Sequence, residues 1–280
     1  MKKRVVAVII ATFLLGITTL RMAQAQAPTQ APKTASKEPK AKTQQEYEAF
    51  TKFNAETDFV KKTAEGEQFI KDFPDSELTV PFVYPRMLVG YQQQNNYEKT
   101  VEYGEKILVA DPSNTFALFM LSLVIPERIK DDDLDRQQKL DHTTEYAKKL
   151  LEVVASMPKP AQMTEEQWKG QKAQLLGGAY SALGFVALHK KNYDEAISNY
   201  KKSLEAFPKD PIAYYRLGLS YSFDKKNDEA IKALASSVAM NGPAQAKSYL
   251  EQLYKAKNNG SLDGLDKVIA EAASGLKQTP

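Results

Sequence analysis

Two histidines, His142 and His189, are the side chains best suited to acid–base or metal chemistry near neutral pH, because imidazole titrates there. A zinc site needs several ligands at close spacing, and neither histidine has a second ligand so placed. His142 follows Leu140 and Asp141, as a residue that caps or flanks a helix does. His189 lies where a helix should end, and a partial positive charge is favourable there. The sequence predicts no metal site and no catalytic histidine.

A run of aspartates, Asp131 to Asp133 followed by Asp135, alternates in a way that suits calcium coordination. A calcium loop of the EF-hand type also requires glycine at its sixth position and glutamate at its twelfth. Those positions hold Arg136 and His142. The other interpretation, which we adopt, is an acidic helix N-terminus stabilised by the helix dipole.

Motifs that carry enzymatic chemistry are missing, including a glycine-rich phosphate loop, a G-x-S-x-G elbow and an H-E-x-x-H helix. Gly177 and Gly178 lie inside a helical pattern with no strand before them, so they indicate close packing against a neighbouring helix. The chain has no cysteine, which excludes a thiolate nucleophile, a thiolate metal site and lipid attachment through an N-terminal cysteine. We therefore expect no enzyme, no cofactor and no metal.

Residues 1–25 have the organisation of a secretory signal peptide. A basic start at residues 2–4 precedes an apolar run from Val5 to Leu20, and small residues alternate up to Ala25. We place cleavage after Ala25, because cutting after Ala27 would put Pro28 on the wrong side of the scissile bond. The alternative is an uncleaved membrane anchor, although this run is shorter than the roughly 20 residues that span a bilayer. Residues 26–42, rich in proline and lysine without large apolar residues, are predicted to be a disordered linker.

Removal of the signal peptide changes the charge of the chain. The net charge of +3 comes from 38 basic and 35 acidic residues. Residues 1–25 hold four of the basic residues and no acidic residue, which leaves 34 against 35, or −1. A nucleic-acid-binding protein normally carries a basic face, so nucleic acid is not expected as a partner.

An internal repeat determines the predicted fold. From Glu46 onward, apolar residues recur at helical spacing, and no useful alternating run indicates a strand. Residues 177–210 laid over residues 211–244, at an offset of 34, share ten identities. These identities are Ala179/Ala213, Tyr180/Tyr214, Leu183/Leu217, Gly184/Gly218, Lys191/Lys225, Asp194/Asp228, Glu195/Glu229, Ala196/Ala230, Ile197/Ile231 and Ser203/Ser237.

This period and these residue types resemble the tetratricopeptide repeat family, of an exported bacterial type. The family repeats a helix–turn–helix unit with the pattern W-x2-L-G-x2-Y, then A-x3-F, then P. Small residues lie where the two helices of a unit should cross closely, large ones fill the space beside them, and Asp194 and Asp228 are expected to cap the second helix of each unit. The residues assigned to this packing are Tyr180, Leu183, Gly184, Ala196, Tyr200, Pro208, Tyr214, Leu217, Gly218, Tyr221, Ala230 and Leu234.

Earlier units follow the same register less closely. Residues 81–114 form one unit, in which Pro85 should kink or delay the first helix, and residues 43–76 form another. Residues 115–160 are irregular, with an insertion from Glu127 to Arg136 between a helix that ends at Pro126 and a second helix. Thr164 to Gln167 resembles a capping box that opens a long helix ending near His189.

The predicted architecture is therefore all-α. It is a solenoid of about five helix–turn–helix repeats over residues 43–244, resembling tetratricopeptide repeats, with C-terminal capping helices and a tail over residues 245–280.

In the family, the first helices of successive repeats line a concave groove that takes an extended peptide or a partner helix. Carried over by register, the groove residues are Phe82, Arg86, Val89, Phe119, Phe185, Tyr215, Arg216, Leu219 and Phe223. Some members clamp a peptide carboxylate with lysine, asparagine and arginine, of which only Arg86 and Arg216 have counterparts. The resemblance implies an apolar groove for a hydrophobic helix or strand; alternatively, Phe185 and Leu219 pack against the adjacent repeat.

These observations predict a non-catalytic exported scaffold that binds proteins or extended peptides in the cell envelope. After cleavage it would be soluble in the periplasm or another extracytoplasmic compartment. One alternative is a membrane-tethered component of envelope assembly or secretion, with residues 5–20 kept as an anchor. Another is an enzyme or a small-molecule carrier. The sequence leaves the oligomeric state open.

Overall fold

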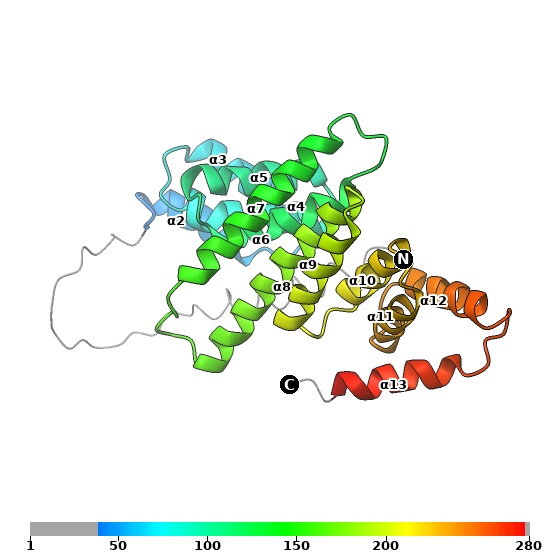
Figure 1. The fold of residues 1–280 in the computed structure, drawn as a ribbon. Helices are drawn as coiled ribbons and strands as arrows, with labels where there is room; N and C mark the ends of the chain where they lie inside the picture. The colour runs from blue at the N-terminus through cyan, green and yellow to red at the C-terminus, as the bar shows by residue number, and fades with distance from the viewer. Residues whose placement is uncertain (1–38, 278–280) are drawn as a thin grey trace. The chain divides into compact units, whose positions relative to one another are not determined.

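The computed structural model describes residues 39–277, and every regular element in this range is helical (Figure 1). The all-α prediction is therefore confirmed for these residues. They belong to two compact units, which meet in the chain between Tyr103 and Gly104. The signal peptide predicted for residues 1–25, the anchor that is its alternative, and all of the predicted linker up to residue 38 lie outside the described residues.

The first unit contains α2 (Gln44–Ala55), α3 (Phe59–Asp72), η1 (Thr79–Val83), α4 (Tyr84–Gln93) and the start of α5 (Tyr97–Ala110). The Thr43 and Asp58 side chains accept hydrogen bonds from the first turns of α2 and α3 and so cap them. Phe53, Val83, Met87, Leu88 and Tyr103 form the fully buried core.

Pro85 delays α4, as the sequence predicts. The chain first makes one π-helical turn, η1, in which the Val83 amide donates to the Leu78 carbonyl at 3.2 Å. Helix α4 then begins at Tyr84, which places Pro85 in its first turn. A proline ring is tolerated there, because the first amides of a helix have no intrahelical acceptor.

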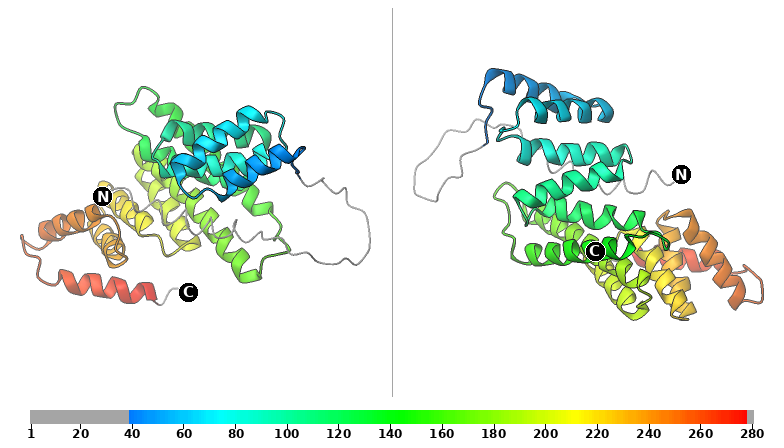
Figure 2. Two further views of the ribbon diagram at one scale, coloured as in Figure 1. Left: turned by 180° about the vertical axis from the view of Figure 1, so that it is seen from behind. Right: turned by 90° about the horizontal axis from the view of Figure 1, so that it is seen from above.

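The second unit continues α5 from Gly104, and from α6 to α12 each α-helix packs against the next one in the chain (Figure 2). Its further elements are α6 (Thr115–Val124), η2 (Pro126–Arg128), α7 (Arg136–Ser156), α8 (Glu165–His189), α9 (Tyr193–Ala206), α10 (Pro211–Phe223), α11 (Asn227–Ala239), α12 (Ala244–Lys257) and α13 (Leu265–Lys277). Helix α8 packs on α7 and α9, and α10 packs on α9 and α11. Helices α12 and α13 both pack against α11, and they occupy the stretch predicted for capping helices.

The two closest sequence repeats have the same turn between their helices. Lys191 and Lys225, which are 34 residues apart, both adopt positive φ, at 59° and 61°. In each turn the next amide reaches back five residues, from Asn192 to the Ala187 carbonyl and from Lys226 to the Tyr221 carbonyl, both at 2.9 Å. The repeat seen in the sequence is therefore also a repeat of backbone conformation.

Two sequence predictions about helix ends differ in outcome. The capping box is confirmed at α8, where Thr164 and Gln167 exchange hydrogen bonds at 3.0 and 3.2 Å. Capping of α9 and α11 by Asp194 and Asp228 is wrong, because both helices begin earlier and place these aspartates within their first turns. Their carboxylates still interact favourably with the positive end of the helix dipole.

Candidate functional site

Helix α10 carries the densest set of groove residues predicted from the sequence. Tyr215, Leu219 and Phe223 are four residues apart, so they share one face of the helix with Arg216 beside them. Tyr215 and Leu219 are half-buried, and Phe223 is 53% exposed. This face is the part of the predicted groove that α10 presents.

Ring contacts continue this face onto the neighbouring first helices. The Arg216 guanidinium lies 4.8 Å from the centre of the Phe185 ring on α8, and the rings of Tyr215 and Tyr249 on α12 are 6.2 Å apart. We call this set the first-helix strip; it consists of Phe185, Tyr215, Arg216, Leu219, Phe223 and Tyr249. The strip therefore runs across α8, α10 and α12.

Arg216 is held in place within the strip. Its guanidinium forms an ion pair with Glu127, which comes from η2 in the insertion. Burial alone would lower the pKa of Arg216, but the neighbouring Tyr200, Glu127 and Asp210 outweigh burial and raise it. Arg216 therefore stays charged, and its charge is compensated within the protein.

The insertion is also fixed to the end of α8. Arg136 donates from Nη2 to the backbone carbonyl of His189 at 2.6 Å. The His189 ring stacks on Phe185 with 4.2 Å between ring centres. Burial lowers the pKa of His189, and the charges of Arg136 and Arg216 lower it further. At neutral pH this histidine is an uncharged part of the packing beside the strip.

The other predicted groove residues occupy more enclosed positions. Phe119 on α6 is buried, and a Cβ atom added to Gly178 would lie 2.4 Å from its ring. In the first unit, Val89 is buried, and Arg86 donates to the Phe82 carbonyl at 2.8 Å. Burial lowers the pKa of Arg86. Phe119 and Val89, like the buried Phe185 of the strip, therefore contribute to the core rather than to an exposed surface in this structure.

The residues assigned to repeat packing lie at close helix crossings. A Cβ atom on Gly184 would lie 2.9 Å from the Tyr200 ring, and one on Gly218 would lie 2.6 Å from Leu234 Cγ. The buried residues among them are Gly184, Ala196, Tyr200, Leu217, Gly218, Tyr221, Ala230 and Leu234, and the half-buried ones are Tyr180, Leu183, Pro208 and Tyr214. Glycine is needed at both crossings because no side chain would fit.

The aspartate run makes ion pairs with basic side chains of α7. Asp133 and Asp135 each lie 2.9 Å from Lys139, and Asp131 lies 3.8 Å from Arg136. Between residues 39 and 277, no group of three or more acidic or histidine side chains is arranged to hold a metal ion. In the same range, no helix is long and apolar enough to span a bilayer.

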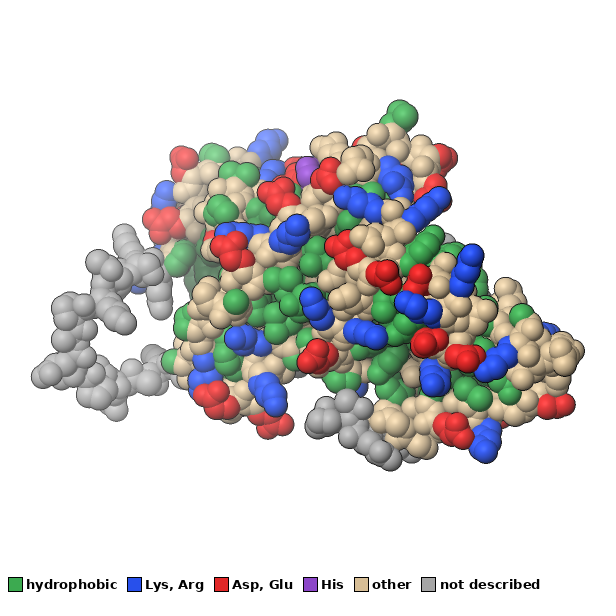
Figure 3. Space-filling view, viewed as in Figure 1, with side chains coloured by type: hydrophobic (Ala, Val, Ile, Leu, Met, Phe, Trp, Pro, Cys, Tyr) green, Lys and Arg blue, Asp and Glu red, His purple; other side chains and the backbone are tan. Residues whose placement is uncertain are grey.

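Two members of the site were missed by sequence reasoning. Tyr249 was missed because it falls within residues 245–280, which the sequence predicts only as capping helices and a tail, although it follows Tyr215 by the 34-residue period of the repeat. Glu127 gave no local signal, because its partner Arg216 is 89 residues further along the chain. The face shown in Figure 3 mixes acidic and basic side chains without an extended area of either sign.

These features define a class of protein, the α-helical repeat proteins built from stacked helix pairs. Residues 175–242 match the tetratricopeptide repeat family, so the chain carries tetratricopeptide repeats in this segment. Repeats of this family generally bind proteins or peptides. No curated protein matches the chain at a significant level.

Several solved structures resemble the chain. A crystal structure of MamA is 18% identical, with a TM-score of 0.44, and the match covers 69% of this chain and 93% of that one. The structure titled "MamA RS-1 ArsTM double mutant" is 14% identical, with a TM-score of 0.45 and coverage of 70% and 94%. A tetratricopeptide repeat protein from Parabacteroides merdae ATCC 43184 is 14% identical, with a TM-score of 0.40 and coverage of 84% and 100%. The repeat assignment rests on the family match and on the repeated geometry.

Proposed function

We propose that the protein is a non-catalytic scaffold whose first-helix strip binds a protein or peptide partner. The observation that carries this proposal is the continuity of the strip from Phe185 through Arg216 and Tyr215 to Tyr249. Phe185 is buried against Arg216, and the other rings of the strip are half-buried or exposed. Together these side chains form an elongated surface on successive helices, which suits an elongated guest.

The chemistry of the strip indicates which guest it accepts. Five of its six residues are apolar or aromatic, and the charge of Arg216 is already matched by Glu127. A C-terminal carboxylate would have to displace Glu127 before it could bind Arg216. An apolar peptide face, helical or extended, needs no such exchange and is the guest we propose.

Site-specific photo-cross-linking in cells tests this assignment. A photoreactive residue at Phe223 or Tyr215 should capture a partner, whereas one at the exposed Lys232 on α11 should not. Mass spectrometry then identifies the captured protein. Capture from Lys232 with none from Phe223 and Tyr215 would place the binding surface on the opposite side of the helix pairs.

We also propose that the scaffold acts outside the cytoplasm, in the periplasm or an equivalent compartment. Support comes from the basic start, the apolar run and the small residues before Ala25. The intact mass of the protein purified from its cells tests this: a chain that begins at Gln26 supports export and cleavage. A membrane-bound protein that retains residues 1–25 would instead support the tethered assembly component.

A further inference from the structure

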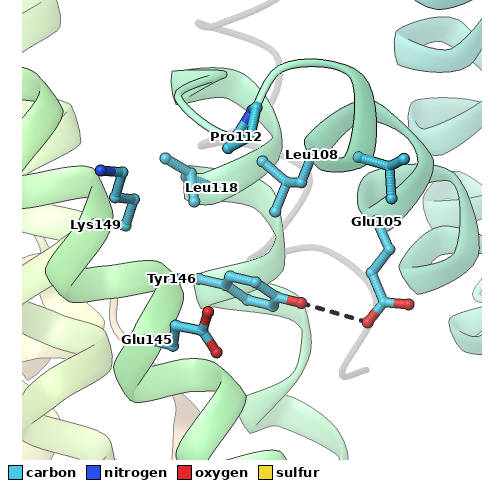
Figure 4. Close-up of a pocket in the computed structure, with 8 residues that line it drawn as sticks. Glu105, Leu108, Pro112, Leu118, Glu145, Tyr146 and Lys149 are labelled. Atoms are coloured by element: carbon cyan, nitrogen blue, oxygen red, sulfur yellow. Dashed lines mark hydrogen bonds between the residues drawn. The ribbon is translucent and has the colours of Figure 1, made fainter.

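A cleft away from the first-helix strip lies between the end of α5, the turn that follows it, the start of α6 and the middle of α7 (Figure 4). Its volume is about 470 Å³, which is within the range of ligand-binding pockets. The lining residues are Glu105, Leu108, Val109, Pro112, Leu118, Glu145, Tyr146 and Lys149. None of them belongs to the strip, so the cleft is a separate feature of the second unit.

The floor of the cleft is apolar. Leu118 is buried at the base, while Val109 is 85% exposed at the edge. The Tyr146 ring crosses from α7 towards α5, where its hydroxyl donates to Glu105 at 3.4 Å. A bulky apolar side chain entering the cleft would cover Val109 and the ring, which removes apolar surface from water.

The rim of the cleft is acidic. Lys149 already forms an ion pair with Glu152 at 3.1 Å, outside the cleft. Glu105 is bonded to the Tyr146 hydroxyl, and Glu145 is exposed without an ion-pair or hydrogen-bond partner among the described residues. Burial raises the pKa of Tyr146, and Glu105 and Glu145 raise it further, so the phenol stays neutral and cannot offset their charge.

From this apolar floor and uncompensated acidic rim, we propose that the cleft binds a peptide segment of a partner protein in which a bulky apolar side chain is flanked by lysine or arginine. The apolar side chain lies against Val109, Leu118 and the Tyr146 ring. The flanking cation lies between Glu105 and Glu145, where opposite charge gives specificity more than affinity. This second contact would let the scaffold hold two partners, or two segments of one partner, and it does not depend on the strip.

Methyl NMR of the full chain, with isotope-labelled leucine and valine, tests the proposal. The probe is a blocked tetrapeptide with the sequence lysine-leucine-leucine-lysine, and the comparison peptides replace both lysines by glutamate or both leucines by serine. The first peptide should shift the methyl signals of Leu108, Val109 and Leu118, and neither comparison peptide should do so at the same concentration.

Two variants with matched controls assign the binding to the cleft. Glu145→Lys turns one attraction into a repulsion and should weaken binding about threefold to tenfold. Glu205→Lys, the same change at an exposed position on α9, should leave binding unchanged. Val109→Ser should weaken binding about twofold to fivefold, whereas Val60→Ser, at a position that is 63% exposed on α3, should not.

Three results would overturn the proposal. They are equal binding of the glutamate peptide, shifts confined to residues such as Leu219 in the strip, and the absence of any shift at millimolar peptide. The second result would still be compatible with binding at the strip, so the proposal for the cleft and the proposal for the strip can be refuted separately.

Discussion

Replacement of Gly218 by alanine tests whether the repeats depend on a close helix crossing. The added Cβ would lie 2.6 Å from Leu234 Cγ, 2.9 Å from Leu234 Cδ2 and 3.3 Å from the Ala230 carbonyl oxygen. Leu234 is fully buried, and the contact is with its branch point rather than with a flexible end. The nearby Ala230 oxygen belongs to the backbone of the same helix, α11, and cannot move independently, so α10 and α11 must separate slightly.

Two opposing effects determine how much Gly218→Ala changes the stability of the protein. Overpacking of this kind costs about 1–3 kcal/mol, and replacing glycine by alanine inside a helix gains about 1 kcal/mol. The difference between them is a net loss of up to about 2 kcal/mol in the free energy of unfolding. For a domain of this size that lowers the midpoint of thermal unfolding by up to about 8 °C.

Gly170→Ala is the matched control, because Gly170 lies in α8 and a Cβ there would meet nothing within 4 Å. It should raise the midpoint by about 1 to 4 °C through helix propensity alone. Circular dichroism at increasing temperature measures both variants. If Gly218→Ala stabilises the protein as much as Gly170→Ala does, the argument that glycine is needed for a close approach is refuted.

A double-mutant cycle separates this clash from other effects. Leu234→Ala alone should cost about 2–5 kcal/mol, because it empties a fully buried site. In the Gly218→Ala background the same change also removes the clash, so its cost should fall by at least about 0.5 kcal/mol. Strict additivity of the two changes would show that the two positions are not coupled.

Three further predictions follow from the contacts described above. Glu127→Gln should weaken the attachment of η2 to Arg216, cost at most about 1 kcal/mol in stability and speed amide hydrogen exchange in residues 126–135; unchanged exchange there would contradict the role of this ion pair. Because burial, Arg136 and Arg216 lower the pKa of His189 below its ordinary value of 6.5, the unfolded chain binds more protons than the folded one just below that pH, and folding stability should fall as pH drops through this range. Urea denaturation of His189→Gln should show a shallower fall than the wild type, with His142→Gln as the control variant, and equal pH dependence of wild type and His189→Gln would contradict the assignment. Ser203 and Ser237 donate to the Gly177 and Pro211 carbonyls at 2.8 and 2.7 Å, so Ser203→Ala and Ser237→Ala should each cost about 1 kcal/mol in urea denaturation, and a large difference between them would show that the two repeats are not energetically equivalent.

Local signals in the sequence predicted most of the helical organisation. The shared period predicted matching helix pairs at α8–α9 and α10–α11, because each pair has glycine at its close crossing, opposite a large side chain. Pro85 predicted a delayed α4, and Thr164 predicted the start of α8. Each of these features depends on residues close together in the chain.

Features that depend on distant residues could not be predicted in this way. The repeat register identified a helix face but not how exposed its side chains are, so the predicted groove included Phe119, Val89 and Phe185, which are buried. It also could not show that Glu127 would pair with Arg216, because the irregular insertion follows no repeat. The caps of α9 and α11 were misassigned because a first-turn aspartate and a capping aspartate give similar sequence patterns only two residues apart.

The hydrogen bonds from Ser203 and Ser237 recur at the same 34-residue interval as the turns at Lys191 and Lys225. Each of these two helix pairs is therefore closed internally by the same turn and the same serine hydrogen bond. An additional copy of residues 177–210, inserted before residue 211, should fold into its own helix pair through these contacts. The protein could then be lengthened by whole units, which would extend its binding surface.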